Sequence, residues 1–304
     1  MPLTPRTRDR QPRRTLCLIL PLVVLLVLMV GDLASAAYPG ANGKIAFVQF
    51  DGGFDIYSVD VDGSDLDRLT GARSDYEPAW SPDGTKIAYD RIVQGTYQIF
   101  TMNADGSDRE QLSSGQADNL WSTWSPDGSK LAFTSYRDQD GDDEIFVMDA
   151  DGTGRVQLTH NRAMDYHAAW SPDGTRIAFN REVDHRQDLW VINPDGSDPT
   201  NLTPGPLQGG SPSWSPDGTK IAFVRNREIY VMDADGSDVV QLTTNTWRDT
   251  SPAWSPDGTL IAFYSDRFGD ADIWFKSASG GGLTRVTDTP RKSEFDPDWQ
   301  PLVP

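Results

Sequence analysis

Short apolar runs alternate with clusters of turn-forming residues along most of this 304-residue chain. One recurring run has the form Ile-Ala-Phe. Another has the form Ile-Tyr-Val-Met, which is apolar on both faces like a strand packed between two neighbouring sheets. Pro-Asp-Gly and Asp-x-Asp-Gly clusters separate the runs; proline presets φ, aspartate bonds to the local backbone and glycine accepts a positive φ. The pattern predicts an all-β protein of short strands and tight turns.

A tryptophan marks each repeat of this pattern. It recurs every 40–46 residues, at Trp80, Trp124, Trp170, Trp214, Trp254 and Trp299. Ser-Pro-Asp-Gly follows the first five tryptophans, and a pair such as Leu-Thr closes each unit. Each unit therefore holds four β-prone runs, and four-stranded units of about 40–45 residues have the spacing of propeller blades.

The two ends of the repeat region supply complementary parts of one unit. Residues 43–70 contain the second, third and fourth strands but lack the tryptophan strand, whereas Asp296–Trp299 supplies only that strand. Five complete units and this composite unit predict a six-bladed β-propeller over residues 38–304. The C-terminal strand would join the N-terminal blade and so remove the exposed sheet edges.

Together, Trp-Ser-Pro-Asp-Gly, Ile-Ala-Phe, Ile-Tyr-Val-Met-Asp-x-Asp-Gly and Gln-Leu-Thr resemble the TolB-type, WD40-like (PD40) β-propeller repeat over nearly all of residues 38–301. The resemblance implies a non-catalytic, protein-binding propeller of the periplasm or cell envelope, with an envelope lipoprotein as one class of partner. TolB-type proteins carry an α/β domain before the propeller, and peptidases with similar blades carry a hydrolase domain with Gly-x-Ser-x-Gly. Neither is found in this sequence, so we expect a bare, monomeric propeller.

The N-terminal region is typical of an export signal. Five arginines precede the apolar run Leu16–Val30, which is short for a membrane span, and Ala34-Ser35-Ala36 is the small-x-small pattern that signal peptidase recognises. We predict a signal peptide over residues 1–36, a new N-terminus at Ala37, a periplasmic or secreted location and no stable membrane span after cleavage. An uncleaved anchor is the alternative.

Charge and cysteine content narrow the chemistry. Removal of residues 1–36 takes away five arginines and two aspartates, so the net charge falls from −18 to −21. Such a surface repels nucleic acid and anionic lipid and favours basic partners or cations, although solubility alone would also explain it. Cys17 is the only cysteine and lies in the predicted signal. The mature protein would thus have no disulfide, thiolate nucleophile or cysteine-ligated metal.

The five residues before each tryptophan are the candidate binding residues, because the inner strand should enter the central channel there. Carboxylates and aromatics are frequent at these positions and suit a basic peptide loop of a protein partner. The predicted partner-binding mouth comprises Asp75, Tyr76, Glu77, Asn119, Trp121, Asp165, Tyr166, His167, Asp249, Glu294, Phe295 and Asp296. The alternative is that the aspartates only cap the turns between blades.

Arginines recur just after the Ile-Ala-Phe runs, at Arg91, Arg137, Arg181, Arg225 and Arg267. One interpretation is a set of anion-binding arms. Because the recurrence follows the blades, we favour ion pairs between neighbouring blades, each of which would add little if exposed.

Metal binding and catalysis are the remaining alternatives. Asp138, Asp140 and Asp142 alternate as in a calcium loop, but Asp143 stands where an EF-hand requires glycine, so a solvated acidic loop without a cofactor is favoured. Of three histidines only His167 should face the channel, which is too few for a histidine-held metal. A metal-assisted hydrolase or lyase acting on glycans or peptides at the channel is therefore the alternative to a scaffold, as is an accessory sensor module.

Overall fold

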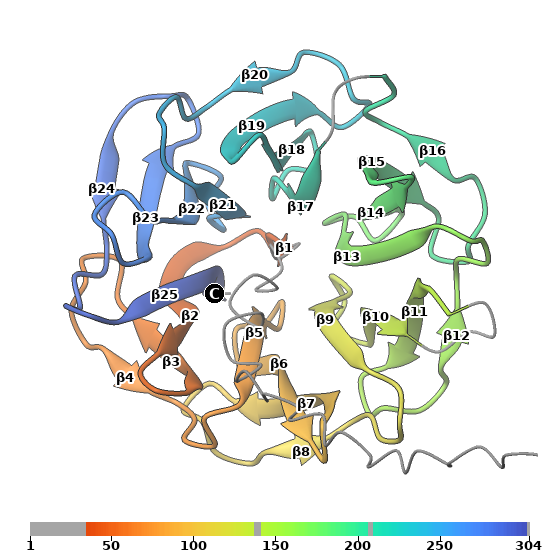
Figure 1. The fold of residues 1–304 in the computed structure, drawn as a ribbon, viewed down its shortest axis with the longest axis horizontal. Coiled ribbons are helices and arrows are strands. Elements are labelled where there is room, and N and C mark those ends of the chain that lie inside the picture. Colours follow the sequence, from red (N-terminus) through yellow and green to blue (C-terminus); the bar gives the residue numbers. More distant parts are fainter. Residues whose placement is uncertain (1–34, 137–140, 206–208, 303–304) are drawn as a thin grey trace, which may run out of the picture. The chain divides into compact units, whose positions relative to one another are not determined.

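The computed structural model describes residues 35–136, 141–205 and 209–302. These residues form strands β1 to β25 and no helix, so within them there is no helix that could cross a membrane. The strands make six sheets arranged around a common centre (Figure 1). The prediction of an all-β, six-bladed propeller is confirmed.

Each blade is an antiparallel sheet whose first strand is the innermost. Blade 2 comprises β5 (Asp75–Trp80), β6 (Lys86–Val93), β7 (Thr96–Asn103) and β8 (Glu110–Gln111). Blade 3 comprises β9 (Asn119–Trp124), β10 (Lys130–Tyr136), β11 (Asp143–Asp149) and β12 (Val156–Gln157). Blade 4 comprises β13 (Met164–Trp170), β14 (Ile177–Val183), β15 (Arg186–Ile192) and β16 (Thr200–Asn201). Blade 5 comprises β17 (Gly210–Trp214), β18 (Lys220–Arg225), β19 (Glu228–Asp233) and β20 (Val240–Gln241). Blade 6 comprises β21 (Asp249–Trp254), β22 (Leu260–Ser265), β23 (Asp272–Ser277) and β24 (Leu283–Arg285).

Blade 1 closes the ring with strands from both ends of the described chain. It comprises β25 (Ser293–Leu302), β2 (Ala41–Phe50), β3 (Phe54–Val59) and β4 (Asp67–Arg68). β25 pairs antiparallel with β2 and places Trp299 opposite Ile45. Closure by the C-terminal strand is therefore as predicted, and it leaves no open edge at the joint.

A short additional strand lies inside the ring. β1 (Ser35–Ala36), at the end of the predicted signal peptide, pairs parallel with β17 at the inner edge of blade 5. The next two residues, Ala37 and Tyr38, are buried, and the Tyr38 hydroxyl donates to the backbone carbonyl of Trp124. Residues 35–38 thus lie against the tryptophan ends of the inner strands.

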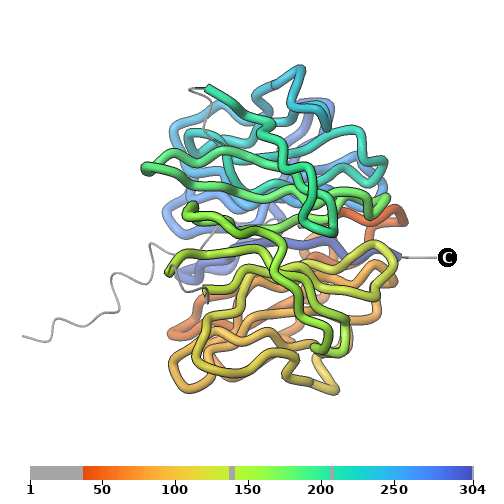
Figure 2. The backbone as a smooth tube through the Cα atoms, turned by 90° about the vertical axis from the view of Figure 1, so that its right-hand side faces the viewer, coloured from red at the N-terminus to blue at the C-terminus, as the bar shows by residue number. Residues whose placement is uncertain are grey.

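The blade strands run between two faces of the ring (Figure 2). We call the face with the Ser-Pro-Asp-Gly turns and the turns between third and fourth strands the turn face. The opposite face, where the inner strands begin, is the mouth face. It also carries the loops between second and third strands and the connections from one blade to the next.

The Ser-Pro-Asp-Gly motif recurs because its side chains close the turn. In blade 2 the Ser81 hydroxyl donates to Asp83 Oδ1 (2.6 Å), and the same oxygen accepts the Thr85 N–H (3.0 Å). Ser81 Oγ in turn accepts the Lys86 N–H (2.9 Å). The other four copies repeat these three bonds, so the motif is a self-contained local network.

The Leu-Thr phrase holds the outer part of each blade, where the fourth strand has only two or three residues. In blade 2 the Ile99 N–H donates to Ser113 Oγ at 2.8 Å. In each of the other five blades a threonine Oγ1 accepts the equivalent N–H of the third strand at 2.9 Å. A side-chain bond therefore extends the short ladder between third and fourth strands.

Every inner strand contains a bulge at the third residue before its tryptophan. These residues have φ between 52° and 57°, although none is glycine, and the ladder to the second strand shifts register around them. They are Glu77, Trp121, His167, Ser211, Ser251 and Asp296. A left-handed conformation is costly for such residues, and a bulge re-aims its side chain, so the sixfold recurrence marks the inner wall as a specialised surface.

The tryptophans alternate in how their indoles are bonded. Nε1 of Trp124, Trp214 and Trp299 donates at 3.1–3.2 Å to the carbonyl of an alanine in the preceding blade. Nε1 of Trp80, Trp170 and Trp254 has no partner within the described residues. The residue before each tryptophan alternates in parallel between alanine and a polar residue: Ala79, Thr123, Ala169, Ser213, Ala253, Asp298. The ring therefore has a two-blade period beneath its six-blade repeat.

Candidate binding surface at the mouth face

Three of the predicted mouth carboxylates lie inside their blades. Asp165 is fully buried and forms a bidentate pair with Arg181, with both N–O distances at 2.7 Å. Asp75 pairs likewise with Arg91, at 2.6 and 2.9 Å. Each pair joins the first and second strands of one sheet, whose register places Asp opposite Arg. The expectation of pairing between blades is therefore wrong for these arginines.

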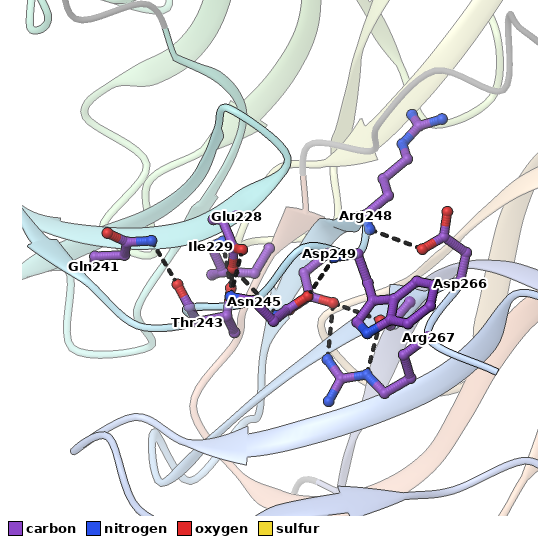
Figure 3. A network of polar contacts seen from close by, with 11 residues as sticks. Glu228, Ile229, Gln241, Thr243, Asn245, Arg248, Asp249, Asp266 and Arg267 are labelled. Atoms are coloured by element: carbon purple, nitrogen blue, oxygen red, sulfur yellow. Dashed lines mark hydrogen bonds and ion pairs between the residues drawn. The ribbon is translucent and has the colours of Figure 1, made fainter.

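Blade 6 repeats the arrangement through a wider network (Figure 3). Arg267 Nη2 bonds Asp249 Oδ1 at 2.8 Å, and the Asn245 side chain donates to Asp249 Oδ2 at 2.6 Å. The Asn245 N–H donates to Glu228 of blade 5 at 2.7 Å. The carboxylate thus ties the start of the inner strand to the connection from the preceding blade.

Aromatic rings also lie beside these ion pairs. The Arg181 guanidinium lies 4.5 Å from the Trp190 ring centroid, and that of Arg267 lies 4.5 Å from the Trp274 centroid. Buried pairs of this kind are costly to break, because the remaining charge has no water to solvate it. A direct contact of these aspartates with a partner stays a prediction, but their charge is already neutralised within the blade.

Glu294 and Asn119, the equivalent residues of blades 1 and 3, are also fully buried. Glu294 accepts from Gln49 Nε2 (3.0 Å) and Thr287 Oγ1 (3.1 Å), and burial raises its pKa to about 7. Asn119 Oδ1 accepts from Arg155 Nη1 at 2.8 Å. The hydrogen bonds of these two buried residues also hold the starts of their inner strands in place.

The aromatic residues of the predicted mouth, with His167, lie in separate groups near the starts of the inner strands. The Trp121 ring lies 4.1 Å from His167 and 5.8 Å from Tyr166, measured between centroids. Tyr76 lies 4.8 Å from Phe54, and Phe295 lies 5.3 Å from Tyr264. The structure therefore brings Trp121, Tyr166 and His167 together and places Tyr76 and Phe295 in separate groups.

His167 is the buried histidine of this wall. Burial lowers its pKa to about 3, so the ring is neutral at physiological pH. Nδ1 lies 3.0 Å from the Asn180 amide nitrogen, whereas Nε2 has no partner within the described residues. The Trp121 backbone N–H donates to the buried Asp90 carboxyl group at 2.7 Å, which holds the bulge beside His167.

Two carboxylates, Glu77 and Asp296, occupy bulge positions on the neighbouring strands β5 and β25. Both side chains are at most 5% exposed, and Asp296 Oδ1 accepts from Ser251 Oγ at 2.8 Å. These two carboxyl groups are therefore buried at the bulges, like the paired aspartates within the blades.

The mouth face also carries large exposed side chains that the predicted site did not include. They are Phe50 (38% exposed), Tyr136 (52%), Met164 (41%), Val183 (53%), Trp247 (48%) and Phe268 (68%). Exposed arginines accompany them, such as Arg73, Arg162 and Arg291. The sequence signal for them was a large apolar residue inside a polar loop, as in Thr-Asn-Thr-Trp-Arg.

The calcium prediction falls mostly outside the described residues, because Asp138 and Asp140 lie there. Asp142 is described and buried. Within the described ranges no group of three or more His, Cys, Asp or Glu residues could hold a metal ion. Burial, with Asp118 and Asp142 nearby, raises the pKa of Asp143 to about 6, as expected for a crowded acidic loop.

The six four-stranded blades, the first of which takes strands from both ends of the described chain, define this protein as a closed β-propeller. The chain belongs to the TolB β-propeller (PD40) family, whose sequence profile matches residues 30–138, 107–227 and 203–302. No curated protein sequence matches the chain.

Solved structures share the fold at low sequence identity. TolB from Acinetobacter baumannii has a TM-score of 0.77 and 22% identity, covering 85% of this chain and 67% of its own. A protein described as TolB from Agrobacterium tumefaciens has a TM-score of 0.69 and 21% identity, covering 85% and 99%. An oligogalacturonate lyase in complex with manganese has a TM-score of 0.60 and 18% identity, covering 84% and 78%. At such identities these likenesses show the fold alone.

Proposed function

We propose that this chain is an exported, non-catalytic protein-binding scaffold of the periplasm or cell envelope, and that its partner docks on the mouth face. Membership of the TolB propeller family and the predicted signal peptide support the location and the class of activity. The observation that carries the docking site is the set of exposed aromatic, methionine and arginine side chains on one face. These residue types dominate protein–protein interfaces.

Trp247 is the best-supported anchor of this surface. Its side chain is half exposed, yet its backbone N–H donates to Asn245 Oδ1 (2.7 Å), and the backbone N–H of Arg248 donates to Asp266 Oδ1 (2.8 Å). Asn245 is itself bonded to Asp249 and Glu228. A large aromatic side chain on a backbone that is already ordered can bind with little further entropy loss.

We expect the part of the partner that enters the channel to be basic. The excess of acidic residues in the chain favours a loop with lysine or arginine, and the Trp121–His167 group offers apolar surface at the inner wall. The partner is then a protein with a projecting basic loop, and an envelope lipoprotein is one class that would present it.

The metal-assisted hydrolase or lyase gains no specific support. The lyase neighbour shares the fold at 18% identity, and a neutral, buried His167 is the only histidine among the predicted mouth residues. Metal analysis of the purified protein tests this alternative directly, since bound metal whose removal abolishes an activity on glycans or peptides would establish it.

The docking site is tested by partner capture from cell-envelope extract with surface variants. Trp247→Ala combined with Phe50→Ala should reduce capture of the partner at least tenfold. Leu66→Ala combined with Leu302→Ala is the matched control, because these two residues are similarly exposed (43% and 46%) at the turn-face end of blade 1. Equal capture by both double variants would reject the mouth face as the docking surface.

A further inference from the structure

The N-terminal end of the described chain lies inside the ring. Ser35 and Ala36 form β1, which pairs in parallel with β17 of blade 5 and places Ala36 opposite Trp214 (Figure 1). β1 also lies against β9, β13 and β21, the inner strands of blades 3, 4 and 6. The backbone of residues 35 and 36 therefore lies among the inner strands of four blades.

Ala37 and Tyr38 anchor this segment on two sides of the channel. The two residues are 4% and 5% exposed. Tyr38 packs in the apolar cluster that includes Trp124 and Trp170, and its hydroxyl donates to the Trp124 carbonyl. Ala37 packs in the cluster that includes Trp254. Two consecutive residues thus bind the segment to blades 3 and 4 on one side and to blade 6 on the other.

The path from this segment into β2 passes the joint at which the ring closes. The Gly40 N–H donates to the carbonyl of Pro256 in blade 6 at 3.3 Å. A Cβ built on Gly40 would lie 3.0 Å from the backbone oxygen of Leu302, in the C-terminal strand β25. The site of residues 35–38 is therefore complete only when blades 3 to 6 and β25 are in place.

The bond between Ala36 and Ala37 is the bond at which the predicted signal peptide ends. A protease binds its substrate as an extended strand, through the backbone on either side of the bond. In the folded ring the backbone before this bond is paired with β17, and the two residues after it are buried. The fold therefore encloses a bond whose sequence suits signal peptidase.

We propose that the closed ring protects the Ala36–Ala37 bond, so that signal peptidase cuts it only before the ring closes. In this reaction water adds across the peptide bond: Ala36 leaves with a new carboxylate, and Ala37 gains an amino group. Chains that are cut first lose β1, and chains that close first keep residues 1–36. The proposal rests on the export signal of the proposed function, and it makes a cleaved signal and an uncleaved anchor the two outcomes of one competition.

Cleavage and protection need different lengths of chain. Residues 35–38 are synthesised early, whereas Ser213 and Trp214, which pair with β1, and the closing strand β25 are synthesised later. Contacts between residues far apart in sequence form slowly, because the chain between them has to be ordered first. A chain that is exported unfolded is therefore cut before it is protected, whereas a chain that folds first is not cut.

Treatment of the purified full-length protein with signal peptidase in detergent tests the proposal, with the products identified by mass spectrometry. A synthetic peptide of residues 16–44 should be cut between Ala36 and Ala37. The folded protein should be cut at least a hundredfold more slowly than this peptide. Tyr38→Ala removes one anchor, so the folded variant should be cut at least tenfold faster than the parent. The same substitution in the peptide should leave its rate unchanged.

Tyr89→Ala is the matched control, because Tyr89 is also a buried tyrosine but packs in the cluster of blades 1 and 2. It lowers the stability of the ring without touching residues 35–38, so this variant should stay as resistant as the parent. A parent protein that is cut as fast as the peptide, or equal rates for Tyr38→Ala and Tyr89→Ala, would overturn the protection alone. A peptide that is not cut would reject the signal peptide itself, and with it both the exported location and this protection.

Discussion

The aspartates of the turn face differ from those of the mouth face in what stabilises their charge. Asp127, in a turn-face motif, is exposed and accepts from Ser125 Oγ (2.6 Å), the Ser129 N–H (3.0 Å) and Ser129 Oγ (2.8 Å). Asp165, at the mouth, is fully buried against Arg181. The first bonds only its own turn, whereas the second joins two strands.

This difference affects how much charge the aspartates add to the surface of each face. Ten turn-face aspartates have a lowered pKa: Asp62, Asp83, Asp105, Asp127, Asp151, Asp173, Asp195, Asp217, Asp235 and Asp257. They keep their charge in solvent and make that face acidic. At the mouth the inner-strand aspartates are buried against arginines, and the surrounding loops expose aspartates such as Asp51, Asp184 and Asp270 together with arginines and aromatics. The repeated aspartates thus add surface charge on the turn face but not at the mouth.

The largest expected effect comes from breaking a mouth-face pair. Asp165→Ala leaves the Arg181 guanidinium, which is only 15% exposed, without its carboxylate. We expect the free energy of unfolding to fall by about 3–5 kcal/mol, measured by urea denaturation at pH 7.

A double substitution separates the loss of charge from the loss of packing. Asp165→Leu with Arg181→Met should recover most of the stability, because it leaves no unpaired charge. If Asp165→Ala costs no more than Asp127→Ala, the two kinds of aspartate are equivalent and the contrast between the faces fails.

The second-largest effect concerns the turn face, at the point where the ring closes. Gly84 has φ of 68°, and a Cβ there would lie 2.2 Å from the backbone oxygen of Pro301 at the ring closure. Gly84→Ala should therefore destabilise by about 3 kcal/mol, through overpacking and the unfavourable φ.

Gly218→Ala is its control. φ is similar at 70°, but the nearest atom to a built Cβ is Pro172 Cγ at 3.4 Å, so only the conformational cost of about 1 kcal/mol applies. Similar melting temperatures for the two variants would show that the closure joint is no tighter than the other turns.

The third effect, of roughly 2 kcal/mol, concerns a mouth-face carboxyl that has no arginine. Burial raises the pKa of Glu294 to about 7, so the folded state binds a proton that the unfolded state releases above the ordinary pKa of 4.5. Its contribution is then most favourable below pH 4.5 and is lost as pH rises through 7. Glu294→Gln should gain stability relative to the parent between pH 5 and 8.

Comparing the two proteins at each pH removes the opposing effect of His167. Its lowered pKa of about 3 makes a contribution that is present above pH 6.5 and is lost as pH falls toward 3, equally in both proteins. A stability difference that does not change between pH 5 and 8 would contradict the assignment to Glu294.

Much of the ring could be derived from the sequence, because the repeat encodes local chemistry. Ser81, Asp83 and Thr85 bond one another, so their spacing alone indicates a turn. Asp75 and Asp165 each precede their arginine by 16 residues within one hairpin, a recurrence that could have indicated pairing inside a blade.

Features that depend on packing between distant segments could not be derived in this way. The left-handed bulges at Trp121 and His167 follow from the register between strands, and no glycine at these positions indicates them in the sequence. In blade 6 the turn between the third and fourth strands is rich in glycine and resembles a flexible loop in sequence. Its Gly280 lies against no neighbouring backbone, and this is recognisable only because the equivalent glycines of the other five blades each make a close contact.

The smallest effect concerns a turn-face aspartate. Its contribution to stability changes with pH in the opposite direction to that of Glu294. Hydrogen bonds from Ser125 and Ser129 lower the pKa of Asp127, so its contribution is present above the ordinary pKa of 3.8 and is lost as pH falls below it. Asp127→Ala should cost about 1 kcal/mol at pH 7, and the cost should vanish toward pH 2. Asp127→Asn, which keeps an acceptor oxygen, should cost less. A penalty for Asp127→Ala that persists unchanged at pH 2 would mean that the side chain acts through packing, and the turn face would then owe its stability to the same kind of contact as the mouth.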